Sequence, residues 1–200
     1  MCGRYYVNDE TAREIEAVIR QVDQRLSNKI FGGSSFLTGE IHPTDVAPVI
    51  VPNGQKLSCK TQRWGFSGFS DKQVIFNARS ESVLEKRMFR ESALHRRIVV
   101  PAAWFYEWNQ RKEKYIFSPK GQPVLFMAGI YNYDQGEERF VILTTAANGS
   151  MKPVHDRMPL ILEKEEILPW MFHEKKAEQM LHKTPCLLER STDFEQMTLF

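Results

Sequence analysis

The clearest helical pattern lies near the start of the chain. It follows two candidate N-cap residues, Asn8 and Asp9. Its apolar positions recur every three or four residues: Ile15, Val18, Ile19, Val22 and Leu26. Because this spacing places them on one face of an amphipathic helix, we expect a helix with a structural role here. A second helix is predicted over Ser82–Leu94.

From Ile98 onward the pattern changes to short apolar runs separated by turn signals. The predicted strands are Ile98–Trp108, Tyr115–Phe117, Val124–Tyr131 and Phe140–Thr145, with others over 46–51 and Leu160–Leu162. Turns are indicated by Ser118-Pro-Lys-Gly and Asp134-Gln-Gly. A loop is expected over 28–44, and helical turns within 163–183. The pattern therefore predicts a meander of largely antiparallel strands.

Length and composition suit one globular domain, because 200 residues with 42% hydrophobic content can bury a sizeable core. We expect that domain over 1–189, followed by a polar tail with an apolar end over 190–200. No run approaches the roughly 20 apolar residues needed to cross a bilayer, and no secretory signal is evident, so a cytoplasmic protein is expected. A formal net charge of +2 permits nucleic-acid binding only through local groups of Lys and Arg.

The cysteines are too few and too widely spaced to form a disulfide framework. Cys2, Cys59 and Cys186 are odd in number and lack the spacing of a zinc site, so reduced thiols and no metal are expected. No motif indicates a nucleotide cofactor. Cys2 is nevertheless distinctive, since removal of Met1 would leave an α-amine and a β-thiol on one residue. With ordinary pKa values, both groups would be partly deprotonated near neutral pH.

An amine and a thiol so placed can capture an aldehyde. The amine condenses to an imine, and the thiol then closes a five-membered thiazolidine ring. A small second residue can also simply permit removal of methionine, and a lone cysteine is usually a small buried hydrophobe. Cys2 alone therefore does not show whether it captures an aldehyde or has only a structural role.

Four polar motifs in order along the chain resemble the signature of the SOS-response-associated peptidase (SRAP) family. They are Met1-Cys2-Gly3-Arg4-Tyr5, Asn77-Ala78-Arg79-Ser80-Glu81, Phe105-Tyr106-Glu107-Trp108 and His155-Asp156-Arg157-Met158-Pro159. Arg63-Trp64-Gly65 and Thr144-Thr145-Ala146-Ala147-Asn148 also resemble segments of that signature. The resemblance implies a single α+β domain of twisted, barrel-like, mainly antiparallel strands with flanking helices. It also implies a sensor of abasic sites in single-stranded DNA that forms a covalent DNA–protein crosslink through its N-terminal cysteine.

The resemblance implies an acid/base role for Glu107. Alternation along a strand places Trp104, Tyr106 and Trp108 on one face, which we interpret as the core face, and Glu107 on the other. A carboxylate partly desolvated in a cleft is suited to proton transfer, whereas an ordinary strand glutamate would simply be solvated. With the resemblance, Glu107 is expected to assist sugar-ring opening and imine formation.

The family resemblance also assigns roles to His155 and Asn77. His155 follows a loop containing Gly149 and Pro153, where an imidazole could exchange protons near neutral pH and protonate the sugar oxygen. Asn77 offers an uncharged amide that could orient the Cys2 amine or the opened sugar. The structural alternatives are a surface histidine and an asparagine that closes a turn.

Four further residues are candidate DNA contacts. Arg4, Arg79 and Arg157 carry forked guanidinium groups that match phosphate oxygens, with a structural ion pair as the alternative for Arg157. Trp64 offers a ring on which a base could stack.

Two other functions use overlapping residues. A thiol peptidase or amidohydrolase would use Cys2 as nucleophile, with His155 and Glu107 moving protons, and would turn over rather than be consumed. Weak lyase cleavage could accompany the imine stage of capture. A non-covalent DNA-binding module would explain the arginines but not Cys2.

The C-terminus carries a separate short motif. Gln196-Met197-Thr198-Leu199-Phe200 resembles the Gln-x-x-Leu-Phe peptides that dock on the bacterial replication sliding clamp. Here Gln196, Leu199 and Phe200 would make the contact. The alternative is a tail that packs Leu199 and Phe200 on its own domain.

Overall fold

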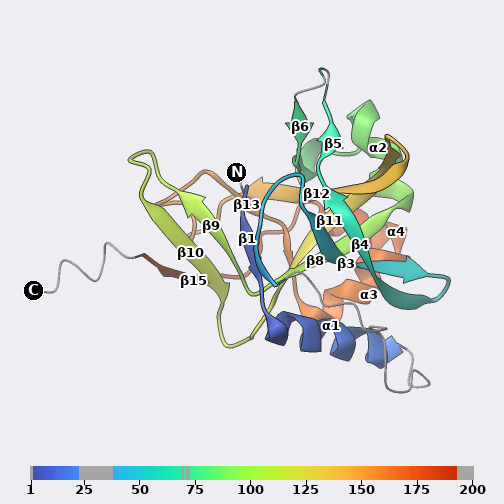
Figure 1. Ribbon diagram of the computed structural model, residues 1–200, viewed down its shortest axis with the longest axis horizontal. Helices are drawn as coiled ribbons and strands as arrows, with labels where there is room; N and C mark the ends of the chain where they lie inside the picture. Colours follow the sequence, from blue (N-terminus) through green and yellow to red (C-terminus); the bar gives the residue numbers. More distant parts are fainter. Residues whose placement is uncertain (1, 23–37, 69, 71–72, 193–200) are drawn as a thin grey trace, which may run out of the picture.

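A closed ring of five strands forms the centre of the computed structural model, which describes residues 2–22, 38–68, 70 and 73–192 (Figure 1). The ring strands are β3 (Val46–Asn53), β4 (Lys56–Trp64), β8 (Arg97–Ala102), β11 (Leu125–Asp134) and β12 (Glu137–Ala146). They are hydrogen-bonded in the order β12-β4-β3-β8-β11, and the pairing of β11 with β12 closes the ring. Only the β12–β4 pairing within the ring is parallel.

Short strands extend the ring at two places. β7 (Asn77–Arg79) runs parallel to β12, and β13 (Arg157–Pro159) runs antiparallel to it. β14 (Ile161–Leu162) pairs with β11, while β5 (Phe66–Ser67) and β6 (Val74–Ile75) form a separate small ladder. The strands β7 and β13 thereby bring two of the polar motifs to β12.

A second, five-stranded sheet lies beside the ring, at the left of Figure 1. Its order is β15 (Leu188–Ser191), β10 (Lys114–Pro119), β9 (Trp104–Trp108), β1 (Tyr5–Val7) and β2 (Gly39–Ile41). Every neighbouring pair in it is antiparallel. The N-terminal strand β1 is therefore hydrogen-bonded on both sides.

Four helices are present among the described residues: α1 (Asp9–Val22), α2 (Arg87–His95), α3 (Ile167–Phe172) and α4 (Glu174–Met180). 3-10 turns cover Ser80–Ser82 and Lys164–Glu166. Asn8 caps α1, because its Oδ1 accepts a hydrogen bond of 2.8 Å from the Thr11 backbone N–H. Capping satisfies one backbone donor that the helix itself leaves unpaired.

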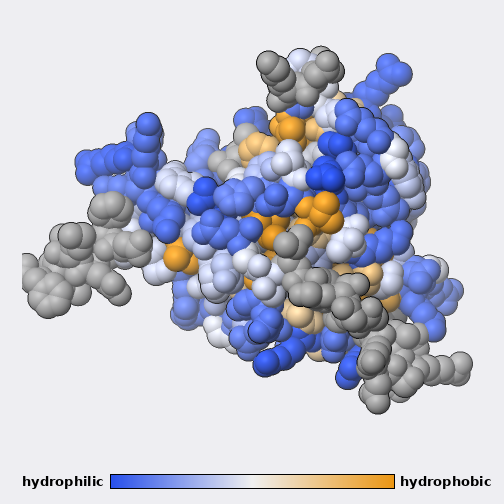
Figure 2. Space-filling model, in the orientation of Figure 1, coloured by the Kyte–Doolittle hydropathy of each residue, from blue (hydrophilic) through white to orange (hydrophobic). Residues whose placement is uncertain are grey.

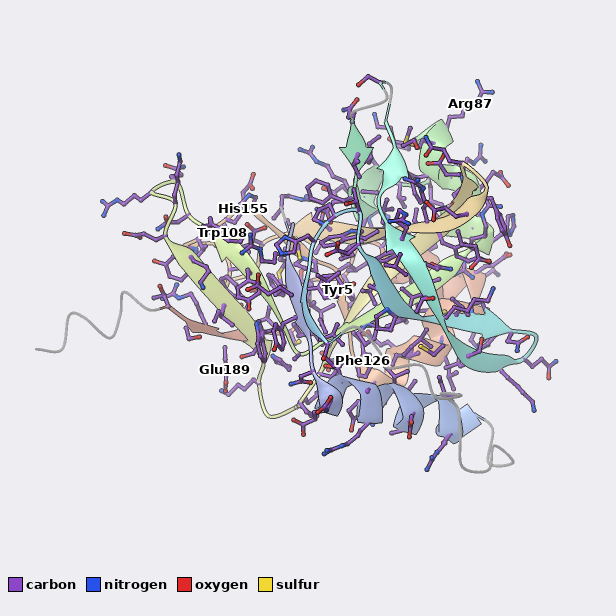
Figure 3. The ribbon with its side chains drawn as sticks, viewed as in Figure 1. Tyr5, Arg87, Trp108, Phe126, His155 and Glu189 are labelled. Carbon is purple, nitrogen blue, oxygen red and sulfur yellow. The ribbon has the colours of Figure 1, made fainter. Side chains whose placement is uncertain are left out.

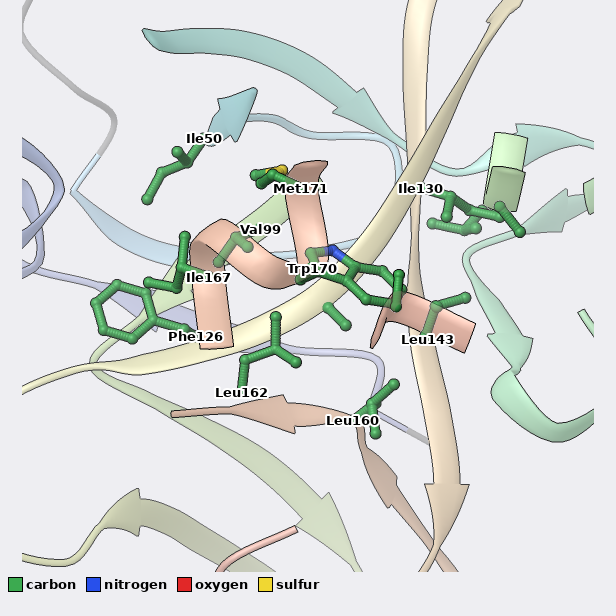
Figure 4. Packing of buried hydrophobic residues seen from close by; sticks show 14 of the residues in the cluster. Ile50, Val99, Phe126, Ile130, Leu143, Leu160, Leu162, Ile167, Trp170 and Met171 are labelled. Atoms are coloured by element: carbon green, nitrogen blue, oxygen red, sulfur yellow. The ribbon is translucent and has the colours of Figure 1, made fainter. Parts of the chain in front are cut away.

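Two apolar clusters divide the interior. One contains buried residues of the helices and one face of the ring strands, including Ile15, Ile50, Val99 and Trp170 (Figure 4). The other contains the alternate ring positions together with Cys2, Tyr5 and Val7 at the start of the chain. Since successive strand residues point to opposite faces, the helices and β1 lie on opposite faces of the ring strands. Cys2 is thus packed away from the helices.

The predicted fold class is confirmed: one α+β domain with barrel-like, mainly antiparallel strands and flanking helices. The predicted helix over Ser82–Leu94 was placed too early, because a 3-10 turn precedes α2. The loop predicted over 28–44 contains β2, and residues 23–37 lie outside the described part. The boundary predicted between 189 and 190 lies within β15 (Leu188–Ser191).

The predicted strand Ile98–Trp108 is two strands in two different sheets. β8 belongs to the ring and β9 to the five-stranded sheet, with Ala103 between them. The predicted core face of β9 was wrong for Trp104 and Trp108, although Tyr106 is buried at 5% exposure. Phe105 and Glu107 are buried, at 0% and 3% exposure, whereas Trp104 and Trp108 are partly exposed. A row of aromatic residues can be mistaken for a core face, because tryptophan and tyrosine side chains carry a polar group and are often only partly buried.

The surface seen in Figure 2 is mostly hydrophilic, with hydrophobic residues in small, separate areas near the middle, toward the top and at the left of the view. No helix among the described residues is long and apolar enough to cross a membrane.

Candidate functional site

Cys2 lies three residues before the start of β1 and is completely buried, at 0% exposure. Burial, followed by the negative charge of Glu107, raises the pKa of the Cys2 thiol far above its ordinary value. The thiol donates a long hydrogen bond of 3.9 Å to the carbonyl oxygen of Arg4. The expectation of a partly ionised thiol near neutral pH was therefore wrong, because sequence cannot show that the second residue enters the core.

Asn77 contacts Cys2 directly. Its Nδ2 donates a hydrogen bond of 2.8 Å to the backbone carbonyl oxygen of Cys2. Its Oδ1 is buried and accepts no hydrogen bond from the described residues. The side chain reaches this position because Asn77 opens β7, which is held against Ile142 of β12. An acceptor thus remains available beside the backbone of the second residue.

Glu107 lies in the middle of β9, next to the strand that Cys2 precedes. Its side chain faces inward with Phe105, at 3% exposure, and its Oε2 accepts a hydrogen bond of 3.3 Å from the Trp108 backbone N–H. The Tyr106 backbone N–H donates a hydrogen bond of 2.9 Å to the Arg4 carbonyl oxygen, which holds this end of β9 beside the segment that contains Cys2. A buried carboxylate beside a thiol is well placed to take or return a proton.

His155 lies in the turn between β12 and β13 and lines a cavity of about 610 Å³. The opposite wall of that cavity is the turn after β9, and Figure 3 shows His155 near Trp108. The Arg157 backbone N–H donates a hydrogen bond of 2.9 Å to Nδ1 of His155. The Asp156 carboxylate lies 2.9 Å from the same nitrogen.

Arg157 makes the structural ion pair rather than an open phosphate contact. Its guanidinium donates to both carboxylate oxygens of Glu81 and to the Thr144 carbonyl oxygen. Hydrogen bonding to Arg157 lowers the pKa of the Glu81 carboxyl. This ion pair joins the segment after β7 to β13, and so joins the motif of Asn77 to that of His155. Glu81 had no predicted role, although its place in the same motif as Asn77 was an available signal.

The other two arginines remain accessible. Arg79 is exposed and is in no ion pair within the described part of the chain. The Arg4 guanidinium lies 5.1 Å from the centre of the Trp108 ring and 3.4 Å from the Glu40 carboxylate, with 33% of its side chain exposed. Arg79 is therefore the freer of the two for an incoming phosphate.

Trp64 cannot stack on a base in this structure, because it is 0% exposed. Its ring packs against Tyr5, Phe76 and Phe140, and its Nε1 donates to the Phe76 carbonyl oxygen at 2.8 Å. Gly65 follows with φ +115°, and a Cβ there would meet Val74 Cγ1 at 2.3 Å. The Arg63-Trp64-Gly65 segment therefore serves the fold, and the stacking prediction was wrong.

Replacement of Trp64 by alanine is expected to destabilise the protein by about 3–5 kcal/mol, the usual cost of removing a large buried ring. Denaturant unfolding followed by circular dichroism measures this. Trp108→Ala is the matched control, since its ring is partly exposed and should cost much less. Equal losses in the two variants would contradict the assignment of Trp64 to the core.

The buried thiol of Cys2 also predicts a pH dependence of stability. Its folded pKa is raised, so the stability it contributes is fully present below the unfolded pKa, near 8.5, and is lost progressively as pH rises towards the folded value. Above about pH 8.5, the free energy of unfolding should fall by about 1.4 kcal/mol per pH unit more in the native chain than in Cys2→Ala. Parallel pH profiles for the two proteins would contradict the burial of the thiol.

Among the described residues, no three His, Cys, Asp or Glu side chains come together in a way that could hold a metal ion. The candidate reacting groups are the side chains of Cys2, Asn77, Glu107 and His155. The structure brings Asn77 and Glu107 to Cys2, and it places His155 on the cavity that faces the β9 strand end.

Comparison with known proteins gives a consistent result. The chain matches the profile of the family described as SOS response associated peptidase (SRAP) over residues 1–198. It is 36% identical over 120 residues to the abasic site processing protein YedK of Escherichia coli, a match that covers 56% of this chain and 54% of that protein. It is 31% identical over 191 residues to the abasic site processing protein YoqW of Bacillus subtilis, covering 86% of this chain and 80% of that protein.

The fold also matches solved structures. A crystal structure of a Bacteroides thetaiotaomicron protein superposes with a TM-score of 0.72 at 22% identity, covering 98% of this chain and 94% of that one. At this identity the likeness concerns the fold alone.

Proposed function

The chain belongs to the SOS response associated peptidase (SRAP) family, and on that premise we propose that it captures abasic sites in single-stranded DNA through Cys2 after Met1 is removed. Relatives that match this chain are named abasic site processing proteins. We also expect it to act in the cytoplasm, associated with the nucleoid when bound to DNA.

The observation that carries this proposal is the contact between Asn77 and Cys2. A side-chain amide fixes the backbone of the second residue, and its remaining oxygen is buried without a hydrogen-bond donor among the described residues. A free α-amine on Cys2 would supply such a donor. A free amine offers more N–H donors than the single peptide N–H that remains when Met1 is present, and a buried acceptor without a donor costs free energy.

The proposed chemistry proceeds in two stages. The Cys2 amine adds to the aldehyde carbon of the ring-opened abasic sugar, and the carbinolamine loses water to give an imine. The thiol sulfur then bonds to the imine carbon as the C=N π pair moves onto the nitrogen, and the thiol proton passes through the buried Glu107 carboxylate to that nitrogen. His155 would donate a proton to the sugar oxygen that becomes a hydroxyl as the sugar opens. The closed thiazolidine suppresses the β-elimination that an imine permits.

Burial of the Cys2 thiol disfavours the alternative of a turnover peptidase. A peptidase that uses cysteine needs a thiolate to attack a carbonyl, and here burial opposes ionisation of the thiol. An imine is a stronger electrophile and is held on the same residue, so the neutral thiol suffices. Self-removal of Met1 and weak lyase cleavage remain secondary activities to be measured.

Intact-mass analysis and a denaturing gel test the proposal. Protein shown to lack Met1 is mixed with a single-stranded oligonucleotide that contains one abasic site. A heat-stable one-to-one adduct is expected, and it should be missing with Cys2→Ala, with undamaged DNA, and with protein that carries an extra N-terminal residue. Multiple turnovers of a peptide substrate without an adduct would favour the peptidase instead.

Loss of the Arg79 side chain is expected to weaken binding of the strand without affecting the fold. Arg79→Ala should change the free energy of unfolding by less than about 0.5 kcal/mol, because the side chain is exposed. The salt dependence of DNA affinity should decrease by the equivalent of one phosphate contact. Fluorescence anisotropy at several salt concentrations measures this, and an unchanged slope would remove Arg79 from the DNA contacts.

We further propose that the C-terminal motif docks on the replication sliding clamp. Gln196, Leu199 and Phe200 lie outside the described residues, so the proposal rests on the motif alone. Deletion of residues 196–200 is expected to abolish capture of the protein by immobilised clamp. Unchanged capture after the deletion would rule the motif out.

A further inference from the structure

A second cavity lies on the helix side of the ring, away from the candidate reacting groups. It measures about 300 Å³, at the lower end of the range for small-molecule sites. Residues of α2 and α4, at the right of Figure 1, line much of it. Cys2 packs on the opposite face of the ring strands. The proposed capture chemistry therefore uses none of the residues of this cavity.

The walls of this cavity are mostly apolar. The apolar lining residues are Leu84, Ala93, Leu94, Trp170, Ala177 and Leu181. Trp170, Ala177 and Leu181 are each at most 3% exposed. The Trp170 ring is held in place because its Nε1 donates a hydrogen bond of 2.9 Å to the Ile98 carbonyl oxygen. The cavity can therefore take an apolar molecule out of water against a fixed surface.

One buried cation lies among these apolar groups. Arg97, the first residue of β8, is 7% exposed and lines the cavity. Its Nε donates to the Trp170 carbonyl oxygen at 2.6 Å, and its Nη1 donates to the Ala93 carbonyl oxygen at 3.0 Å. Both carbonyls belong to the last turn of a helix, α3 and α2, where they have no partner within the helix. The guanidinium group therefore joins two helix ends to the ring.

No carboxylate balances the charge of Arg97. Its hydrogen-bond partners are neutral carbonyl groups, and no Asp or Glu of the described chain forms an ion pair with it. Its Nη2 makes one long hydrogen bond of 3.5 Å, to the Met171 carbonyl oxygen, so one of its two N–H groups has no acceptor among the described residues. Burial lowers the pKa of the Arg97 guanidinium, while the negative charge of Glu174 opposes that shift. An anion that reached this group would therefore stabilise it.

The charges at the rim of the cavity balance one another. Arg90 and Lys175 are exposed cations, and Glu174 and Glu178 are exposed anions. The unbalanced charge of the lining is thus the positive charge of Arg97. An anion that enters is attracted to the buried group rather than to the rim as a whole.

We infer that this cavity binds a small carboxylic acid with an apolar body, in its ionised form. The carboxylate accepts a hydrogen bond from Nη2 of Arg97, and the apolar body lies against Trp170 and Ala177. Inorganic phosphate matches the guanidinium but not the apolar walls, and a neutral apolar molecule leaves the charge of Arg97 unbalanced. The site does not depend on the proposed capture of DNA, so failure of either leaves the other intact.

Titration of the Met1-processed full chain with hydrocinnamate tests the inference. NMR follows the indole N–H of Trp170, and a dissociation constant of about 1 mM or tighter is expected for a ligand of this size. Hydrocinnamamide, which has the same body and a neutral head group, should bind at least tenfold more weakly. This comparison tests the charge of Arg97 without a substitution there, which would release two helix ends. Equal binding of acid and amide, displacement of the acid by an equal concentration of inorganic phosphate, or no shift of the Trp170 signal would overturn the inference.

Charge reversal at the rim tests whether the acid enters this cavity. The double variant Arg90→Glu, Lys175→Glu should bind hydrocinnamate several-fold more weakly, because it places two negative charges beside the entrance. The matched control is Arg87→Glu, Lys176→Glu, which makes the same change of charge at exposed residues of the same two helices that do not line the cavity. The control should bind nearly as tightly as the native chain. Equal weakening in both double variants would contradict this cavity as the site.

Discussion

Serine in place of Cys2 is expected to eliminate the heat-stable adduct while leaving the imine intact. The variant keeps the α-amine, which can still condense with the aldehyde, but a hydroxyl is a far weaker nucleophile than a thiol for closing the ring. Without reductant, the abasic strand should therefore migrate freely on a denaturing gel. With borohydride present during the reaction, a reduced imine should be trapped as a one-to-one adduct.

The Cys2→Ala variant is the natural control, since it removes the hydroxyl as well and should give the same borohydride-dependent adduct. Strand cleavage should increase in both variants, because an imine that cannot close remains open to β-elimination. A heat-stable adduct from Cys2→Ser without borohydride would contradict the thiazolidine. No trapped adduct from either variant would contradict the role of the α-amine.

Replacement of Glu107 by glutamine is expected to slow capture by roughly 10²–10⁴-fold, the usual range for loss of a general acid/base group. Glutamine has nearly the same shape, and its amide can still accept from the Trp108 backbone N–H, so the fold should persist. The measurement is the single-turnover rate of adduct formation with the internal abasic strand.

Replacement of Glu107 by glutamine also has a second effect, which would increase the rate of capture. Glu107 raises the pKa of the Cys2 thiol through its charge, so glutamine would lower that pKa and favour ring closure. The predicted slowing therefore requires that proton transfer matters more than thiol ionisation. Glu113→Gln is a suitable control, because Glu113 lies on the same hairpin but binds Asn109. A Glu107→Gln rate within about tenfold of the native rate would assign the residue a structural role only.

The sequence predicted the strands of the ring better than those of the five-stranded sheet. β11 and β12 are long, apolar and separated by Asp134-Gln-Gly, whose Gln135 and Gly136 adopt the positive φ of a tight hairpin turn. β1 and β2 have three residues each, too few for periodicity to show. They form because neighbours distant in sequence pair with them.

The candidate site was predicted in part. Asn77 could be assigned to Cys2 through family resemblance, and the hydrogen bond between them fits that role. The burial of Trp64 and of the β9 side chains could not be predicted from the sequence, because it depends on which sheet each strand joins. An inward-facing glutamate looks the same in sequence as an outward-facing one, since a one-residue shift of register exchanges the two faces.

If Cys2 captures DNA as proposed, its place in the fold bears on how the attached DNA can be released. Cys2 lies three residues before the start of β1, a strand hydrogen-bonded to β9 on one side and β2 on the other, and the Arg4 carbonyl oxygen between them accepts a hydrogen bond of 2.9 Å from the Tyr106 backbone N–H. A protease cannot clip such an anchor from the folded chain, because cleavage sites must first leave their sheet. The rate at which proteases remove the protein from the DNA would then depend on how often the domain unfolds. A short peptide left on the strand would indicate that unfolding had occurred.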